Sequence, residues 1–415
     1  MQNSQEINQW NEKNSIVNGV ASTVVLNMSN NYFALFAIGV LGATNYQVGL
    51  ISSLPQIIGL AAIIICSVIM GRLNEKKRFT GYSILFTRLF LIGMFFVVFL
   101  PYEYRAWVFV LLVGFMNLPG SFANLSWQSF IGDLIPDNRR SGFFSERNKA
   151  LTIAGMIATL AVGLCLQMFD KSNPVPYQML FAVAFIFGLI EVYYLNRHIE
   201  TKKELPAQKR KSTVNWSVYR YKPFLYFIIC GLFFNFAWQM AWPLFSIYQI
   251  KFAHATGFWI SIFTVANQVA QIVSFKWWGR MADKYSNAKM LAVCGVGMAT
   301  APVLTILSAN MIYLTFVNLI TGVFVSGTVL LLFNQLLEVT KEENRGSYIA
   351  QYNILLAFVG FVAPQFGVYL LEQTSMDTAM YISGSLRAVS GGVFMLFYFS
   401  IHKKRIFSRK VAVGH

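Results

Sequence analysis

The sequence predicts an all-α integral membrane protein with twelve transmembrane helices in two pseudo-symmetric six-helix halves. Apolar residues make up 56% of the 415-residue chain and charged residues only 12%, about half the share found in soluble domains. The chain also repeats itself at a spacing of 208 residues, the distance from Gly71 to Gly279. At that spacing Asn27 corresponds to Asn235. A repeat of membrane-length segments indicates two related halves.

Twelve apolar stretches are long enough to cross a hydrocarbon core, which takes about 20 residues. We expect spans at 16–41, 47–70, 80–100, 106–132, 143–168, 177–196, 223–249, 257–278, 290–309, 311–337, 347–371 and 377–400. The fourth and tenth stretches contain helix-weakening residues, and we expect interruptions there: Pro119 with Gly120, and Gly322 with Gly327. Such breaks are tolerated inside a bundle, where neighbours satisfy the backbone groups.

The positive charge of the chain sets its orientation. The net charge is +16, and most of the 33 Lys and Arg residues lie in the tails or in the loops after even-numbered spans. This bias places both termini in the cytoplasm and the chain in the cytoplasmic membrane, and it argues against nucleic acid as a partner. The predicted parts are a cytoplasmic segment 1–15, a first half 16–196, a cytoplasmic linker 197–222, a second half 223–400 and a basic cytoplasmic tail 401–415.

The loops after the second and eighth spans carry a repeated motif of a glycine followed by an acid and a lysine. The residues are Gly71, Glu75 and Lys76, then Gly279, Asp283 and Lys284. On this motif, in this topological place, the chain resembles the major facilitator superfamily over its whole length. The second glycine and the basic pair of the family pattern are absent, because Arg78 and Ser286 stand at the glycine positions.

The resemblance implies a gating role for this motif. In the family the acid meets the start of a helix from the other half and closes the cytoplasmic side; here those helix starts lie near Ser141 and Ser347. We expect the glycines to allow close helix packing or a left-handed helix end. Ordinary loop charges that fix the topology are the simpler alternative. A second repeated block, which follows the fourth and tenth spans, supplies two more acid–base sets: Asp133 with Arg139, and Glu338 with Arg345.

Polar side chains within the apolar spans predict the substrate cavity, because such groups usually face the interior of a bundle or a cavity. Asn27 and Asn31 share one helix face, as do Asn235 and Gln239 at the matching positions. In the family, helices 1, 4, 7 and 10 line the central cavity. The alternative is that these amides only join helices. The predicted set is Asn27, Asn31, Gln56, Asn124, Trp127, Gln128, Asn235, Trp238, Gln239, Asn267, Gln271, Gln335 and Asn353.

The predicted lining is neutral, which suits a small neutral polar or amphipathic solute held by hydrogen bonds and aromatic contacts. Charges near the ends of spans, Arg147 among them, are counted with the loop charges, and three other charged residues lie within spans: Arg88, Glu191 and Arg387. Arg88 and Glu191 have depths that would let them pair across helices 3 and 6, so a structural pair is favoured. Glu191 is also the best candidate for a proton carrier. The sequence offers no acidic partner for Arg387.

The function expected from the resemblance is secondary transport by alternating access, by a protein that is not an enzyme. Multidrug or metabolite efflux is the alternative within the family. A membrane enzyme is disfavoured, because the four histidines are scattered and no catalytic motif is present. We expect no cofactor and no metal. The expected partners are a small-molecule substrate and the lipid bilayer, with H⁺, Na⁺ or no coupling ion left open, and we expect a monomer.

Overall fold

The computed structural model describes residues 2–70, 76–199, 216–341 and 345–412. These residues form helices and connecting turns, and no strand occurs among them. The chain divides into two compact units. The first unit is Met1–Ser212 with Ala255–Ile262, and the second is Thr213–His254 with Phe263–His415.

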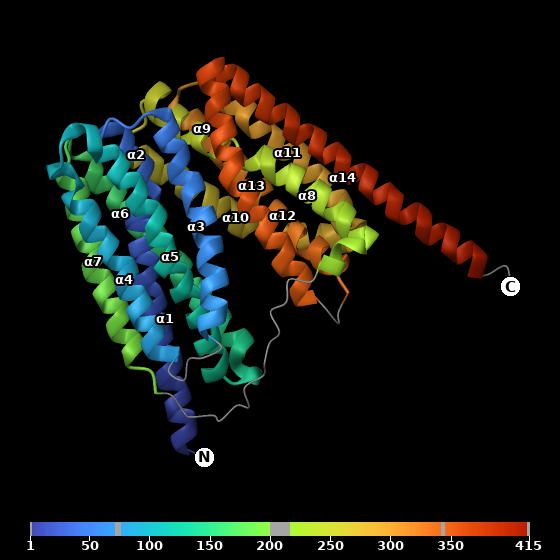
Figure 1. Cartoon of the computed structure of the whole chain (residues 1–415), viewed down its shortest axis with the longest axis horizontal. Helices are drawn as coiled ribbons and strands as arrows, with labels where there is room; N and C mark the ends of the chain where they lie inside the picture. The colour runs from blue at the N-terminus through green and yellow to red at the C-terminus, as the bar shows by residue number, and fades with distance from the viewer. Residues whose placement is uncertain (1, 71–75, 200–215, 342–344, 413–415) are drawn as a thin grey trace. The chain divides into compact units, whose positions relative to one another are not determined.

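The first unit contains six spans, and Figure 1 shows their helices running side by side. The first span is α1 (Gln2–Ser29), the short 3₁₀-helix η1 (Asn30–Tyr32) and α2 (Phe33–Gly39). The next five begin with α3 (Asn45–Met70), α4 (Lys76–Phe96, continued by η2, Val97–Phe99), α5 (Tyr102–Leu134), α6 (Asp137–Gln167) and α7 (Val175–Asn196). Helix α1 packs against α6 and α7, and α4 packs against α5 and α7.

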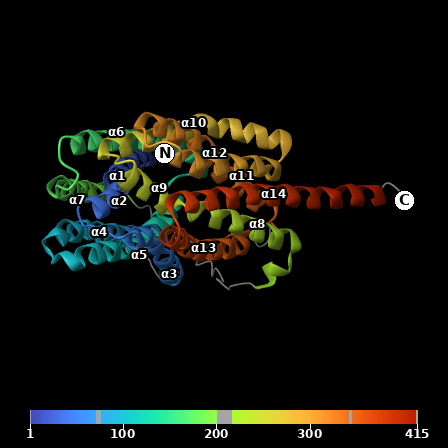
Figure 2. The ribbon, with the colours of Figure 1, turned by 90° about the horizontal axis from the view of Figure 1, so that it is seen from above.

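The second unit repeats this order. It begins with η3 (Trp216–Arg220), and its first span is α8 (Lys222–Gln239), α9 (Trp242–Ile247) and a π-helical turn η4 (Tyr248–Phe252). The remaining spans are α10 (Gly257–Tyr285), α11 (Asn287–Ile306), α12 (Met311–Glu338), α13 (Arg345–Gln373) and α14 (Met376–Ala412). Seen from above in Figure 2, α14 lies beside α11 and α8 and contacts both, while its C-terminal part extends beyond them.

The helix breaks do not fall where the sequence predicted them. Pro119 lies inside the continuous helix α5, and Gly322 and Gly327 lie inside the continuous helix α12. The breaks occur instead in the first and seventh spans, at Asn30–Tyr32 and after Gln239. The expected interruptions of spans 4 and 10 are therefore wrong.

Close packing explains the two glycines of α12. A Cβ atom on Gly322 would lie 2.3 Å from the backbone oxygen of Asn267 in α10. A Cβ atom on Gly327 would lie 2.5 Å from the ring of Trp278 and 2.6 Å from the sulfur of Cys294. Small residues let membrane helices approach closely, because their association depends on packing rather than on hydrophobic exclusion.

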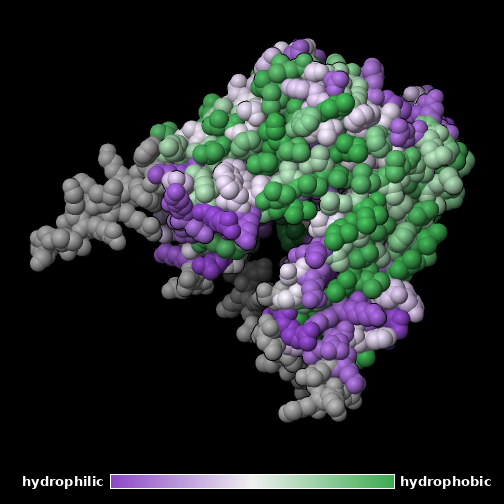
Figure 3. All heavy atoms as spheres, turned by 180° about the vertical axis from the view of Figure 1, so that it is seen from behind, coloured by the Kyte–Doolittle hydropathy of each residue, from purple (hydrophilic) through white to green (hydrophobic). Residues whose placement is uncertain are grey.

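The surface has the polarity of a membrane protein. Ten helices in the described part of the chain are long and apolar enough to cross a bilayer. Figure 3 shows hydrophobic residues over the middle of this face and hydrophilic ones gathered toward its margins. Large apolar side chains such as Phe86, Ile157 and Val273 are exposed, where lipid rather than water would contact them. The chain is therefore a multi-pass membrane protein.

The N-terminal part of α1 is tied to the end of α7. The Trp10 indole donates to the carbonyl of Arg197 at 3.0 Å, and the Arg197 guanidinium lies 4.6 Å from the Trp10 ring. Asn11 donates to the Ile199 carbonyl at 3.0 Å and accepts from the Ile199 amide at 2.9 Å. This polar tie holds together the beginning of the first span and the end of the sixth.

Candidate functional site

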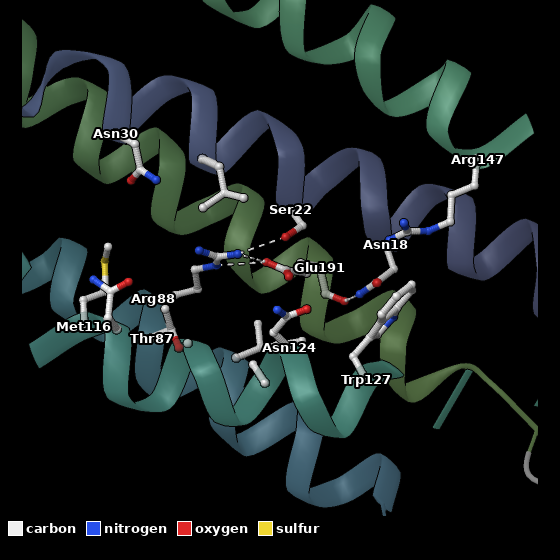
Figure 4. Close-up of a pocket in the computed structure, with 15 residues that line it drawn as sticks. Asn18, Ser22, Asn30, Thr87, Arg88, Met116, Asn124, Trp127, Arg147 and Glu191 are labelled. Atoms are coloured by element: carbon white, nitrogen blue, oxygen red, sulfur yellow. Dashed lines mark hydrogen bonds and ion pairs between the residues drawn. The ribbon is translucent and has the colours of Figure 1, made fainter. Parts of the chain in front are cut away.

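A pocket of about 430 Å³ lies within the first unit, between α1, α4, α5, α6 and α7. Its size falls in the range of small-molecule sites, ~300–1,000 Å³. Figure 4 shows Asn30 and Met116 toward one end, Trp127 and Arg147 toward the other, and Arg88 with Glu191 between them. The lining residues are Asn18, Ser22, Leu26, Asn30, Ile84, Thr87, Arg88, Met116, Asn117, Gly120, Ala123, Asn124, Trp127, Arg147 and Glu191.

A buried ion pair forms one wall of the pocket. Nε and Nη2 of Arg88 donate to Oε2 of Glu191 at 2.9 and 2.7 Å, and both side chains are buried. Nη2 also donates to Oγ of Ser22 at 3.2 Å. The sequence prediction that Arg88 and Glu191 pair is confirmed by these contacts. Charges inside a membrane protein are costly unless they are paired in this way.

The neighbouring helices hold the pair in place. Asn18 of α1 donates to the backbone oxygen of Glu191 at 2.8 Å. Gly188 lies one turn before Glu191 in α7, and a Cβ atom there would come within 2.6 Å of Cγ of Arg88. The missing side chain leaves room for the arginine stem to cross α7.

Half of the hydrogen-bonding capacity of the pair remains open. Nη1 of Arg88 and Oε1 of Glu191 have no hydrogen-bond partner among the described residues. Since both residues line the pocket, the pair offers a donor and an acceptor to a ligand without giving up the contacts that neutralise it.

Arg147 and Trp127 form the other end of the pocket. The Arg147 guanidinium lies 4.2 Å from the centre of the Trp127 ring, a cation–π distance. Nε of Arg147 donates to the backbone oxygen of Ser15 at 3.4 Å. A Cβ atom on Gly19 would lie 2.5 Å from Nη2 of Arg147, so Gly19 lets the arginine lie flat against α1.

The uncharged walls are amides and apolar side chains. Asn117 donates to the Val113 carbonyl at 2.8 Å, and Asn124 accepts from Gln128 at 3.1 Å. Asn124 and Asn30 are exposed to the pocket side of their helices. Leu26 and Met116 supply apolar surface. The pocket thus combines charge, amide groups and a ring in one space.

Of the predicted cavity residues, the pocket contains Asn124 and Trp127. Asn27 and Asn31 are half-buried and do not line it; Oδ1 of Asn27 accepts from Thr159 of α6 at 3.1 Å, and Asn31 donates to the same Oδ1 at 3.3 Å. Gln128 is exposed on α5, and Gln56 is half-buried on α3.

The remaining predicted cavity residues belong to the second unit. Asn235 is buried and donates to the hydroxyl of Tyr352 at 3.2 Å, and buried Gln239 donates to Oδ1 of Asn235 at 3.4 Å. Asn267 donates to the Asn318 carbonyl and accepts from Gln271. Trp238 is half-buried, Gln335 is buried and Asn353 is exposed.

The gating motif is described only in part. Gly71 and Glu75 lie outside the described residues, whereas Lys76 begins α4. In the second copy, Asp283 and Lys284 are exposed at the end of α10. Gly279 is an ordinary helical residue with no atom within 4 Å of a built Cβ among the described residues, and its φ is not positive. Gly279 is therefore not a left-handed helix end in this structure, and its packing role stays a prediction.

The second repeated block shows different partners. Arg139 pairs with Glu12 of α1 at 2.9 Å, and the side chain of Asp133 lies outside the described side chains. Glu338 accepts from Asn287 at 3.3 Å, and Arg345 begins α13.

The structure also explains Arg387, for which the sequence offered no partner. The fully buried guanidinium donates to three carbonyls: Ala237 at 3.2 Å, Trp238 at 2.9 Å and Met298 at 2.9 Å. It also lies 5.6 Å from the ring of Phe245. The first two carbonyls belong to the last turn of α8, where the helix breaks and needs other donors. Arg387 thus joins α14 to α8, α9 and α11.

Sequence reasoning missed Arg147, which it assigned to the cytoplasmic loop charges. The structure corrects this, because α6 begins at Asp137 and carries Arg147 to the pocket. Asn18 and Ser22 were also missed. A signal was present, because Asn18 and Ser22 lie four residues apart and continue through Leu26 to Asn30 along one side of the helix, the side opposite to Asn27 and Asn31.

Comparison with known proteins identifies the family. A profile of the Major Facilitator Superfamily matches residues 18–277 and 227–412. No curated protein sequence matches the chain. Similar solved structures include the nucleoside transporter NupG, which is 13% identical with a TM-score of 0.69 over 94% of this chain and 99% of that one. A D-xylose-proton symporter is also 13% identical, with a TM-score of 0.70 over 93% of this chain and 97% of that one.

A POT family transporter in complex with 5-aminolevulinic acid is also similar, at 12% identity and a TM-score of 0.68 over 93% of this chain and 96% of that one. At such identities the likeness concerns the fold. The family match covers most of the chain, and the order of helices in the first unit is repeated in the second. The protein described here is a membrane transporter that belongs to the Major Facilitator Superfamily.

Proposed function

We propose that this secondary transporter carries a small polar or amphipathic organic solute by alternating access, and that the pocket of the first unit is part of its binding site. The observation that carries the proposal is the pair Arg88–Glu191 in the pocket wall, with Nη1 and Oε1 open to a ligand. Amide groups and the Trp127 ring on the same walls suit hydroxyls, amides and flat rings.

We further propose that Glu191 couples transport to protons. Glu191 is paired with Arg88 inside a membrane-spanning helix, and a ligand that draws Arg88 away would leave its carboxylate without a counterion, where binding a proton removes an uncompensated charge. The groups that face Glu191 are Arg88, Ser22 and Asn18, with Arg147 on the same pocket. Structural pairing without coupling is the competing role, and the test below separates the two.

The test uses the purified protein in proteoliposomes loaded with a pH-sensitive dye. Uridine, D-xylose and a dipeptide are suitable first probes, because nucleoside, xylose and peptide carriers share this fold. We expect one probe or more to accumulate under an inward proton gradient and to move protons with it. Glu191→Gln should abolish accumulation while retaining exchange of labelled for unlabelled solute. Glu103→Gln, an exposed acid outside the pocket, is the matched control.

Normal accumulation by Glu191→Gln would overturn the coupling role. Failure of every probe to move in the wild-type protein would overturn the proposed solute class.

The gate, the orientation and the monomeric state are also part of the proposal. The motif residues Lys76, Asp283 and Lys284, with Glu75 and Gly71, would close the cytoplasmic side, and both termini would lie in the cytoplasm. The loop distribution of Lys and Arg supports this orientation. Reporter fusions at each end, active only on one side of the membrane, test it directly.

A further inference from the structure

We propose that the Arg147–Trp127 end of the pocket binds the carboxylate of the transported solute, so that the substrate class is small organic monoanions with a polar or flat uncharged body. This inference rests on the proposed function, because it concerns the same pocket. It differs from the sequence prediction, which described a neutral lining because Arg147 was counted among the loop charges.

The charges on the pocket walls do not balance. Two guanidinium groups, Arg88 and Arg147, face one carboxylate, Glu191. Arg88 donates twice to Oε2 of Glu191, which neutralises that pair. One positive charge remains, and it lies at the end formed by Arg147.

Among the described residues, the acid that acts on Arg147 is Glu191, which already accepts two hydrogen bonds from Arg88. The contacts of Arg147 among these residues are the Trp127 ring at 4.2 Å and the Ser15 carbonyl at 3.4 Å, which is a long hydrogen bond. The side chain is half-buried in a membrane-spanning bundle. A charge withdrawn from water is costly unless a counterion balances it. A ligand carboxylate bound to Arg147 would balance this charge and form a strong charge-assisted hydrogen bond.

A second donor is unsatisfied at the same end. Nε1 of Trp127 is buried and has no hydrogen-bond acceptor among the described residues. A buried N–H group without an acceptor usually marks a missing partner. The Arg147 guanidinium over the indole ring and the Nε1–H group of Trp127 are both hydrogen-bond donors. A carboxylate has two acceptor oxygens and could bind both donors.

The rest of the pocket suits the uncharged part of such a solute. Away from Arg147 the walls are formed by Asn30, Asn117, Leu26 and Met116. Arg88 and Glu191, midway along, present one donor and one acceptor. A solute with its carboxylate at Arg147 would extend its hydroxyl, amide or ring toward these groups. A dianion is disfavoured, because only one positive charge is left uncompensated.

The test is the binding of matched pairs that differ only in charge. The probes are lactate and lactamide, nicotinate and nicotinamide, and 4-hydroxyphenylacetate and its amide. Their dissociation constants are measured at pH 7.5 on the purified full chain in nanodiscs by calorimetry. We expect an acid to bind at least tenfold tighter than its amide in one pair or more. Arg147→Gln should remove that preference by weakening the acid about tenfold and leaving the amide unchanged.

Two controls separate charge recognition from a general loss of structure. Lys149→Gln removes an exposed charge from the same helix, outside the pocket lining, and should leave both constants unchanged. Gly19→Ala keeps every charge but displaces Arg147, because its Cβ would lie 2.5 Å from Nη2; it should weaken the acid alone. Gly132→Ala, where a Cβ meets no atom within 4 Å, is its matched control.

Acids and amides that bind equally, acids that fail to bind, or an acid preference that survives Arg147→Gln would each overturn the inference. These failures are distinct from failure of the proposed function. If a neutral probe accumulates in a Glu191-dependent way while no acid is preferred, the transport proposal stands and the anion inference falls. If acids bind through Arg147 but no solute is carried, the anion inference stands and the transport proposal falls.

Discussion

Asn235 in α8 repeats the hydrogen bonding of Asn27 in α1. Each side-chain amide donates to the carbonyl four residues earlier, at 2.8 Å to Gly231 and 2.9 Å to Thr23. Each Oδ1 then accepts from the polar residue one turn later, Gln239 or Asn31. Each asparagine also bonds to the fifth span of its own unit, at Tyr352 or Thr159. The internal repeat of the sequence is thus a repeat of contacts.

The first prediction concerns Asn235 and Tyr352. Asn235→Leu leaves the buried Tyr352 hydroxyl without its donor and should destabilise the protein by about 1–3 kcal/mol. Tyr352→Phe in the same chain removes the stranded group and should recover part of the loss. Thermal unfolding in detergent measures both. Equal unfolding midpoints for the single and double variants would contradict the role of this bond.

The second prediction is a double-mutant cycle on the pocket wall. Arg88→Leu or Glu191→Leu alone leaves a buried charge without its partner and should cost about 3–5 kcal/mol. The double variant should be clearly milder than either single variant, since no buried charge is left. Membrane abundance and unfolding midpoints measure the cycle. Additive losses would show that the pair does not hold the helices together.

The third prediction concerns Arg387, which bonds three carbonyls. Arg387→Leu removes all three donors and should destabilise the second unit by roughly 2–3 kcal/mol or more. Arg387→Lys should recover only part of this, because an ammonium lacks the planar fork that spans separate acceptors. Protease accessibility of the second unit in membranes, compared with that of the first, provides the readout. Full stability of the lysine variant would contradict the argument.

The fourth prediction concerns pH and His198, which lies after α7 and is buried against Phe130. Burial lowers the pKa of His198, and nearby Lys77 lowers it further, while hydrogen bonds to the backbone oppose both. Nδ1 donates to the Leu195 carbonyl, and Nε2 has no partner among the described residues. The ring is therefore neutral in the folded protein.

A histidine with a depressed pKa contributes stability above its unfolded pKa, about 6.5, and that contribution is lost as the pH falls. The unfolding midpoint of the wild-type protein should therefore drop more steeply below pH 6.5 than that of His198→Asn. Parallel pH profiles for the two proteins would rule out this source of acid sensitivity.

The sequence predicted the spans well, because apolar length is a local property of the chain. It also predicted the pair Arg88–Glu191, since few charges lie within spans and these two have matching depths. It could not predict that Arg147 reaches the pocket, because that position depends on the bare surface at Gly19 of another helix.

The partners of Arg387 were hidden for a similar reason. The Ala237 and Trp238 carbonyls are available because α8 ends at Gln239. A pattern of side chains in the sequence does not predict which backbone carbonyls are available. The glycines of α12 misled in the opposite direction. They resembled helix breakers, but Gly322 makes room for the backbone of Asn267, and Gly327 makes room for Trp278 and Cys294 of neighbouring helices.

The tie between Trp10, Asn11 and the 197–199 turn has a consequence for biosynthesis. The first span leaves the ribosome long before the sixth, and at ~5–20 residues per second the interval is roughly 10–40 s. During that time Trp10 and Asn11 lack these native partners. We therefore expect the first six spans to mature as one late event, so that a nascent chain stalled before residue 197 still exposes Trp10 to chemical labelling and one stalled well beyond residue 199 protects it.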